Sequence, residues 1–142
     1  MIESRNKELK VYQKWLPTKN WTFIVAVTTK YVLTSYSARR LMDRLIDRLR
    51  RKVFKDNGVI MFWSAEEYNL KEGRHIHLLL EVPNGYKKCD EAKINKAYQI
   101  VSAAVKNREY YRTDIQKYNP KLNGARYVAK DLYKETSDFD IL

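Results

Sequence analysis

The sequence predicts an α+β domain with the split βαβ, ferredoxin-like (RRM-like) arrangement. Segments rich in β-branched and aromatic residues alternate with segments whose apolar residues recur every three or four positions. Their order is β, α, β, β, α, β, α, which is the split βαβ pattern with one helix added. We therefore expect a central antiparallel sheet of four to five strands, helices on one face, and a further C-terminal helix. Right-handed crossovers would put the first and third strands side by side in the middle.

Four stretches have the composition of strands. The first is apolar on both faces, which is typical of a central strand. The second and third are separated by a short polar loop, which predicts a hairpin. The fourth precedes the break at Tyr118, Asn119 and Pro120. The expected bounds are 21–30, 59–67, 74–82 and 110–117.

The clearest helix is expected over residues 38–54, with Ser37 as its N-cap after a loop over 31–36. Its apolar residues form one stripe, and arginines cover much of the remaining surface. A second helix is expected over 90–106 and a shorter one over 123–134. The stripe of the first helix consists of Leu41, Met42, Leu45, Ile46, Leu49 and Val53.

Residues 1–134 are expected to form one domain, because a chain of this length can bury one proper core. It begins with an arm over 1–20, which Pro17 and the polar residues after it separate from the first strand. The arm could hold a short helix and a turn, or be a basic extension. The last stretch, 135–142, is acidic and is expected to be a frayed tail.

The composition favours a nucleic-acid partner. The chain has 142 residues, with 28 Lys and Arg against 17 Asp and Glu, and a net charge of +11. Such a surplus on a small domain is typical of a protein that binds a polyanion. Eleven tyrosines and three tryptophans suit single-stranded nucleic acid, because phosphates meet cations while bases stack on rings. The alternative is a soluble protein that is merely basic.

Two other classes of protein are disfavoured. The sequence has no run of about 18 apolar residues, so no membrane-spanning helix is expected. Residues 1–10 are polar and lack the apolar centre of a signal peptide. The single cysteine, Cys89, excludes an internal disulfide, and a cytoplasmic location is expected.

Two histidines, the only ones in the chain, interrupt the apolar run of the third predicted strand. Successive strand side chains point to opposite faces, so His75 and His77 share one face while Ile76 and Leu78 point into the core. Two imidazoles side by side can hold a divalent metal if a carboxylate joins them. Two half-buried histidines that bind nothing are the alternative, because so short a motif often arises by chance.

Several carboxylates could supply the third ligand. Glu66 and Glu67 end the preceding strand, just across the hairpin loop, and either could reach the histidines. Glu72 in the loop and Glu81 further along the histidine strand are weaker candidates. One carboxylate with two imidazoles suits Mn²⁺ or Mg²⁺ when phosphate and water complete the shell, and zinc would also fit.

Tyr127 and Lys130 supply a candidate nucleophile. A metal beside a basic surface suggests phosphodiester chemistry, which still needs an attacking group. The two residues are three positions apart on the last predicted helix, so they share a face. A tyrosine oxygen can form a phosphoester, and a nearby cation can favour the phenolate or steady the leaving oxygen. Taken alone, the pair is more simply interpreted as part of an ordinary surface helix.

Together these segments resemble the HUH endonucleases, and more narrowly the rolling-circle replication initiators (Rep proteins) of plasmids, small phages and single-stranded-DNA viruses. Residues 23–30 are similar to the first motif of that family, residues 75–77 to its paired-histidine motif, and residues 125–130 to its nucleophile helix. The three motifs occur in family order and span 21–134, nearly the whole chain.

The resemblance implies an enzyme that nicks and rejoins single-stranded DNA. Glu67, His75 and His77 would hold Mn²⁺ or Mg²⁺, and the family spacing of eight residues before the first histidine favours Glu67 over its neighbour. Tyr127 would attack the scissile phosphate and leave a 5′-phosphotyrosyl link and a free 3′-OH. Lys130 would lower the tyrosine pKa or place the phosphate.

The resemblance also implies the single-tyrosine type of enzyme. Asp131 stands where many relatives carry a second tyrosine, and Tyr133 is expected on a different face of the helix. The substrate would be DNA at an origin or in a hairpin, held by Lys30, Arg74, Arg126 and the arginines of the first helix. The protein would act in the cytoplasm of a bacterium that carries a plasmid or phage, or of a virus-infected host. A monomer is expected, which could self-associate on DNA.

Two alternatives remain at this point. One is a non-catalytic nucleic-acid-binding module of the same fold, which explains the charge and the aromatic residues but leaves the histidine pair as a coincidence. The other is a single-tyrosine HUH transposase, whose catalytic helix is swapped within a dimer. Conjugative relaxases are less similar, because two histidines cannot supply their three-histidine cluster.

Overall fold

The computed structural model describes residues 10–11, 14–29, 32–55, 58–67, 74–83, 91–105, 110–119, 121 and 138–142. For residues 66, 67, 74, 105, 110–112 and 138 the description covers the backbone only. Where strands and the second long helix were predicted, observed and predicted bounds agree within two residues. The helix expected over 123–134 lies outside the described residues.

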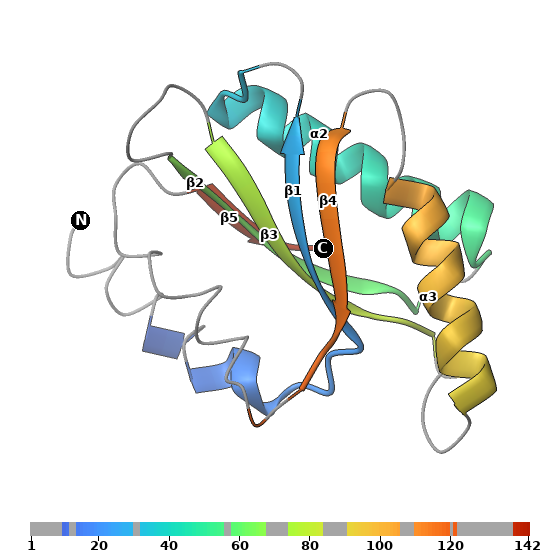
Figure 1. Cartoon of the computed structure of the whole chain (residues 1–142). Coiled ribbons are helices and arrows are strands. Elements are labelled where there is room, and N and C mark those ends of the chain that lie inside the picture. Colours follow the sequence, from blue (N-terminus) through green and yellow to red (C-terminus); the bar gives the residue numbers. More distant parts are fainter. Residues whose placement is uncertain are drawn as a thin grey trace.

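Five strands form one antiparallel sheet in the order β4-β1-β3-β2-β5 (Figure 1). β1 and β3 lie side by side in the middle, as the split βαβ pattern predicts. The α+β fold class is therefore confirmed. The strands are β1 (Phe23–Thr29), β2 (Ile60–Glu67), β3 (Arg74–Glu81), β4 (Tyr110–Lys117) and β5 (Asp138–Ile141).

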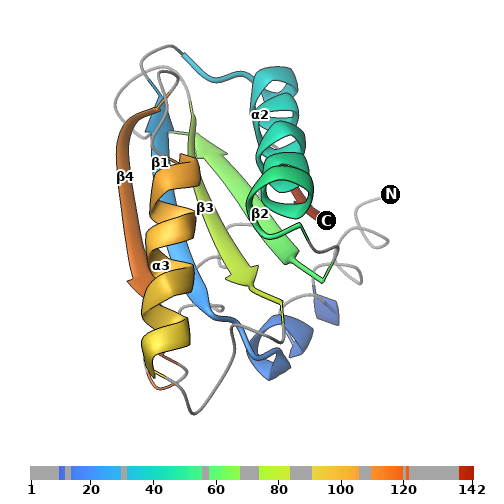
Figure 2. The same cartoon turned by 90° about the vertical axis from the view of Figure 1, so that its right-hand side faces the viewer.

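The helices α2 (Ser35–Arg48) and α3 (Glu91–Val105) cover one face of the sheet (Figure 2). A short π-helical segment, η2 (Leu49–Val53), continues α2. The predicted apolar stripe of the first helix packs into the main core, and only its last residue is partly exposed. From the sheet, this core receives alternate residues of β1, β2 and β3. No helix among the described residues is long and apolar enough to span a membrane.

The first helix begins earlier than predicted, at Ser35. Thr34 is its N-cap, because its side-chain oxygen accepts a hydrogen bond from the backbone N–H of Ser37 at 3.1 Å. The Ser37 hydroxyl oxygen in turn accepts from the backbone N–H of Thr34 at 2.8 Å. This capping box satisfies two backbone donors at once, so the prediction of Ser37 as N-cap and of a loop through residue 36 is wrong.

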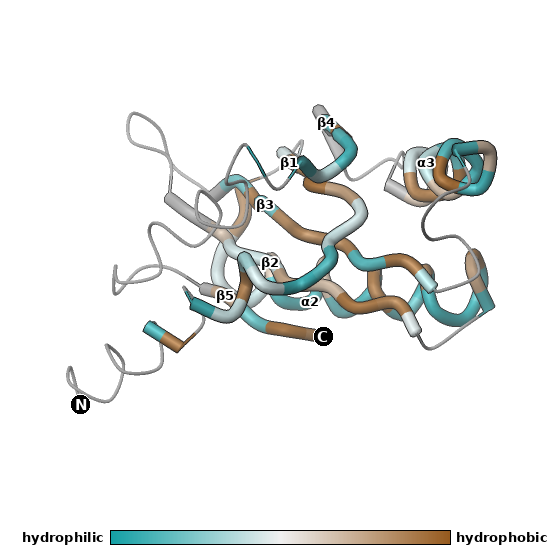
Figure 3. Tube along the Cα trace, turned by 90° about the horizontal axis from the view of Figure 1, so that it is seen from below, coloured by the Kyte–Doolittle hydropathy of each residue, from teal (hydrophilic) through white to brown (hydrophobic). Residues whose placement is uncertain are grey.

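The opposite face of the sheet carries a smaller apolar cluster, in which Leu16, Trp21, Phe62 and Leu79 are buried. The short 3₁₀ helix η1 (Leu16–Thr18) brings the first of these residues to the sheet. The Trp21 indole N–H donates to the Leu16 carbonyl at 2.8 Å. Part of the predicted arm is therefore packed on the sheet. Figure 3 shows the same layering, with hydrophobic residues along the strands and helices that alternate between hydrophobic and hydrophilic.

The last residues form a strand, so the prediction of a frayed tail is wrong. β5 pairs with the outer edge of β2, and Met61 and Leu142 exchange backbone hydrogen bonds of 2.7 and 3.0 Å. Phe139 and Ile141 pack against the smaller apolar cluster. Their alternation with acidic residues is a strand pattern, which the high proportion of charge obscured.

Candidate functional site

His75 and His77 lie on the sheet face opposite α2 and α3, which we call the histidine face. Within β3, Ile76 and Leu78 are fully buried in the core beneath the helices, whereas both histidines are half-buried. The two imidazole centroids are 4.8 Å apart and the ring planes are perpendicular, at 90°. The alternation that was predicted for this strand is confirmed.

Small side chains lie on both sides of His77. Ala26 of β1 and Ser64 of β2 are its partners in the antiparallel register. The same row continues to Asp114 of β4 beside the alanine and to Phe139 of β5 beside the serine. Directly paired residues share a face, so the row places one carboxylate, one imidazole, one hydroxyl and one aromatic ring across the sheet.

Ser64 is fully buried, and its hydroxyl has no hydrogen-bond partner among the described residues. A buried hydroxyl without a partner costs free energy, so such groups are uncommon in folded proteins. Here it lies in register beside His77. The hydroxyl therefore adds a donor and an acceptor to the surroundings of the histidine pair.

The register bears on the third ligand. Glu66 is paired with His75, and Glu67 is paired with Arg74. Because paired residues share a face and neighbours along a strand alternate, position 66 belongs to the histidine face and position 67 to the helix face. The register therefore favours Glu66, whereas the spacing in the sequence favoured Glu67. Only the backbone is described at both positions.

The separation of the two histidine rings is compatible with a shared metal ion. A metal–nitrogen bond is about 2.1 Å long, and ring centroids 4.8 Å apart leave room for one ion bound to both. Among the residues whose side chains are described, no group of three His, Cys, Asp or Glu side chains could hold a metal. The carboxylate of a complete site would therefore come from a side chain that is not described, and Glu66, Glu67 and Glu72 are the candidates.

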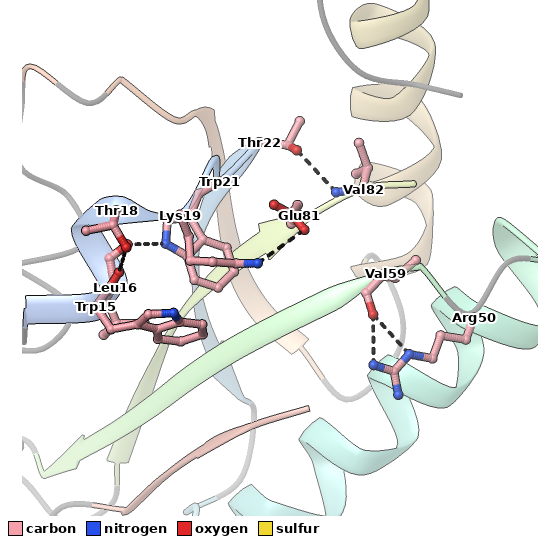
Figure 4. A network of polar contacts seen from close by, with 10 residues as sticks. All are labelled: Trp15, Leu16, Thr18, Lys19, Trp21, Thr22, Arg50, Val59, Glu81 and Val82. Carbon is pink, nitrogen blue, oxygen red and sulfur yellow. Dashed lines mark hydrogen bonds and ion pairs between the residues drawn. The ribbon is translucent and has the colours of Figure 1, made fainter. Parts of the chain in front are cut away.

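Glu81, the weaker candidate on the histidine strand, is engaged elsewhere. Its carboxylate is nearly buried and forms an ion pair with Lys19 at 3.7 Å (Figure 4). Lys19 follows η1, at the end of the sheet that the N-terminal segment covers. Glu72, the other weak candidate, lies outside the described residues.

Most of the predicted DNA-contacting and catalytic residues also lie outside the described part. These are Lys30, Arg126, Tyr127, Lys130 and Tyr133. Their assignments stay predictions. For Arg74 the backbone alone is described, and it begins β3 directly before the histidine pair.

The arginines of α2 do not lie on the histidine face. α2 packs on the other side of the sheet (Figures 1 and 2). Most of its arginines are exposed, and Arg39 reaches Trp63 of β2 and Asp140 of β5. A strand of DNA at the histidines would be separated from them by the sheet and the helix. The prediction that these arginines hold the DNA stays a prediction, and the fold puts them on the side of the sheet away from the histidines.

The polar and aromatic neighbours of His77 in the row, among them Ser64 and Phe139, were not singled out from the sequence. Ser64 is an ordinary residue of a predicted strand, and only the register shows that it adjoins His77. Phe139 lies in the stretch that was predicted to fray. The alternation of Phe139 and Ile141 with aspartates was the available signal.

No protein-family model, curated protein or solved structure matches this chain.

Proposed function

We propose that this protein is a metal-dependent enzyme that nicks and rejoins single-stranded DNA, as HUH replication initiators do. The observation that carries the proposal is the histidine pair. His75 and His77 lie ring to ring at 4.8 Å on the face away from the helices, with the small Ala26 and Ser64 beside the second of them. The net charge of +11 supports a polyanionic substrate.

The chain offers ligands for Mn²⁺ or Mg²⁺. His75 and His77 would bind through neutral imidazole nitrogens, together with Glu66 or, as the sequence spacing suggested, Glu67. When bound, the metal would supply electrostatic stabilisation for charge that develops on the scissile phosphate.

Tyr127 is the proposed nucleophile. Its phenol loses a proton to water, and the oxygen attacks the phosphorus to form a new P–O bond. The bond from phosphorus to the 3′-oxygen of the preceding nucleotide breaks, and that oxygen takes up a proton. The products are a 5′-phosphotyrosine and a free 3′-OH, and attack by a 3′-OH reverses the step. Lys130 favours the phenolate or holds the phosphate.

The proposed substrate is DNA at a replication origin or in a hairpin, and the proposed biological role is initiation of rolling-circle replication in the cytoplasm of a bacterium or an infected host. Lys30, Arg74 and Arg126 are proposed to hold the strand. The protein is proposed to be a monomer that can self-associate on DNA.

Covalent capture tests the proposal. The protein is mixed with Mn²⁺ and a pool of random single strands and varied hairpins, denatured, and separated on a gel. We expect a protein–DNA band that survives denaturation. EDTA, Tyr127→Phe and His77→Ala should each abolish it.

Other outcomes would replace parts of the proposal. A band that persists in Tyr127→Phe would retain the enzyme and discard this nucleophile, with Tyr133 next in line. DNA binding without any band, with metal and hairpins present, would favour a non-catalytic binding module. A band that forms only from an obligate dimer would favour a transposase.

A matched pair of variants distinguishes the two candidate carboxylates. Glu66→Gln and Glu67→Gln make the same change at neighbouring positions with opposite predicted faces. If the register governs the site, the first variant should lose Mn²⁺ affinity by tenfold or more, and the second should stay near the unmodified protein, as the loss of a ligand interaction predicts. Calorimetric titration with Mn²⁺ measures the affinity of both variants. A larger loss in Glu67→Gln would show that Glu67 is the ligand.

A further inference from the structure

Arginine is concentrated in one short part of the chain. Six of the eleven arginines lie between residues 39 and 51, in α2 and η2. The guanidinium fork matches a phosphate with two parallel hydrogen bonds, which the ammonium of lysine cannot do. A cluster of this residue type is therefore more specific to phosphate than general basicity is.

Some of these arginines have internal partners. Arg50 donates two hydrogen bonds to the Val59 carbonyl, at 2.8 and 3.0 Å (Figure 4). Arg39 forms an ion pair with Asp140 at 2.9 Å. Arg48 also donates to the Ala104 carbonyl of α3, at 3.5 Å. These three side chains hold neighbouring segments in place, although Arg39 and Arg48 remain exposed.

Four of the six, Arg40, Arg44, Arg48 and Arg51, are exposed and spaced by four, four and three residues. This spacing puts them along one side of the helix, over about 16 Å at 1.5 Å per residue. Arg51 pairs with Asp47 at 2.9 Å but remains 79% exposed. We call these four side chains the arginine row.

The arginine row begins beside an exposed aromatic ring. The Arg40 guanidinium lies 5.5 Å from the centre of the Tyr36 ring, and Tyr36 is 70% exposed. One of its N–H groups also donates to the Tyr36 hydroxyl at 3.4 Å, and both contacts restrain the guanidinium while Arg40 stays exposed. Arg40 is therefore partly ordered before any ligand binds.

The geometry points to a second nucleic-acid surface: the arginine row binds the phosphate backbone of duplex DNA. A row of about 16 Å is long enough to follow a short stretch of duplex, in which each strand carries one phosphate per 3.4 Å of helix axis. The surface is a convex helix, and Tyr36 is the only aromatic residue between 35 and 53. Single-strand sites instead use a groove lined by several stacking rings, so a duplex fits this surface better.

This surface is separate from the histidine face, because α2 covers the other side of the sheet. Duplex binding here requires neither a metal nor the proposed nucleophile. It would let the protein hold double-stranded DNA that flanks a single-stranded target. Duplex binding is therefore tested independently of the proposed chemistry, and a failure of one does not imply a failure of the other.

The test measures fluorescence anisotropy of a labelled duplex of about 20 base pairs with the whole chain in EDTA, at salt concentrations of about 50 to 200 mM. Arg40→Glu with Arg44→Glu should weaken duplex binding about tenfold or more and lower the slope of log K against log salt by about 2. The matched control is Lys93→Glu with Lys96→Glu on exposed positions of α3. It changes the net charge equally and should weaken binding by less than about threefold.

Equal losses in both double variants would overturn the inference, because net charge alone would then explain them. It would also be overturned if neither variant weakened duplex binding. The same holds if the α2 variant lost more affinity for a matched single strand than for the duplex. Displacement of the duplex by polyglutamate at a lower concentration than by unlabelled DNA would show that the row serves an acidic protein instead. Circular dichroism melts check that all variants remain folded.

Discussion

The two faces of the sheet are built from the same strands and differ in what covers them. The helix face is sealed by α2 and α3 into one large apolar core. The histidine face has a small apolar cluster at one end, covered by the N-terminal segment, and half-buried histidines at the other. β3 contributes to both, with Ile76 and Leu78 on one side and His75 and His77 on the other.

The contrast between the two faces shows how one strand can carry a functional site at little cost to stability. A residue in the sealed core contributes its full apolar area, so it cannot change without loss of free energy of unfolding. A half-buried residue on the other face contributes less to the free energy of unfolding, so a residue type suited to catalysis can be placed there at a small loss of stability.

The largest effect should come from His77→Ala. We expect the rate of adduct formation to fall at least about a hundredfold, because the loss of one ligand disables the metal site, while the free energy of unfolding changes by less than about 1 kcal/mol. Single-turnover gels and urea melts measure the two quantities. If His77→Ala lowered the free energy of unfolding as much as a core substitution does, the proposed difference between the two faces would be contradicted.

The neighbouring substitution, Leu78→Ala, should do the opposite. Removal of a fully buried leucine should lower the free energy of unfolding by about 2–5 kcal/mol. Activity below the unfolding transition should fall only with the folded fraction. Leu79→Ala is the matched control on the histidine face, and the smaller cluster there should collapse more easily and lose less. Equal losses at both positions in urea melts would contradict the contrast.

Trp21→Phe should lower the free energy of unfolding by about 1 kcal/mol. The variant keeps an aromatic ring but removes the indole donor, which leaves the Leu16 carbonyl without its 2.8 Å hydrogen bond. Trp15→Phe is the control, because Trp15 is only half-buried. Thermal melts measure both. No loss in the first variant would show that the N-terminal segment adds little to the histidine face.

The smallest effect is expected at the edge strand. Asp140→Asn removes the ion pair to Arg39, whose two side chains are 45% and 41% exposed, so the loss should be less than about 1 kcal/mol and should shrink in high salt. Asp47→Asn, which breaks a more exposed pair within the helix layer, is the control and should cost no more. A loss of several kcal/mol would mean that β5 depends on this contact rather than on its pairing with β2.

Local periodicity was enough for most of the fold. The alternation in β3 and the three- and four-residue spacing in α2 each depend on neighbours a few positions away, so they were predicted correctly. The N-cap was missed because Thr34 and Ser37 both suit a cap, and only their reciprocal hydrogen bonds distinguish them. The tail was missed because four residues have no strand identity until a partner strand is present.

The periodicity of the sequence was enough to predict the α+β sheet. It also put His75 and His77 on one face, because side chains two positions apart in a strand point the same way. Three features could be read only from the three-dimensional structure. They are the register that pairs Glu66 with His75, the pairing of β5 with β2, and the position of the arginine row on the helix side of the sheet. Each of these joins segments far apart or turns on a shift of one residue. A shift of one residue exchanges the two faces of a strand, and no local pattern records it.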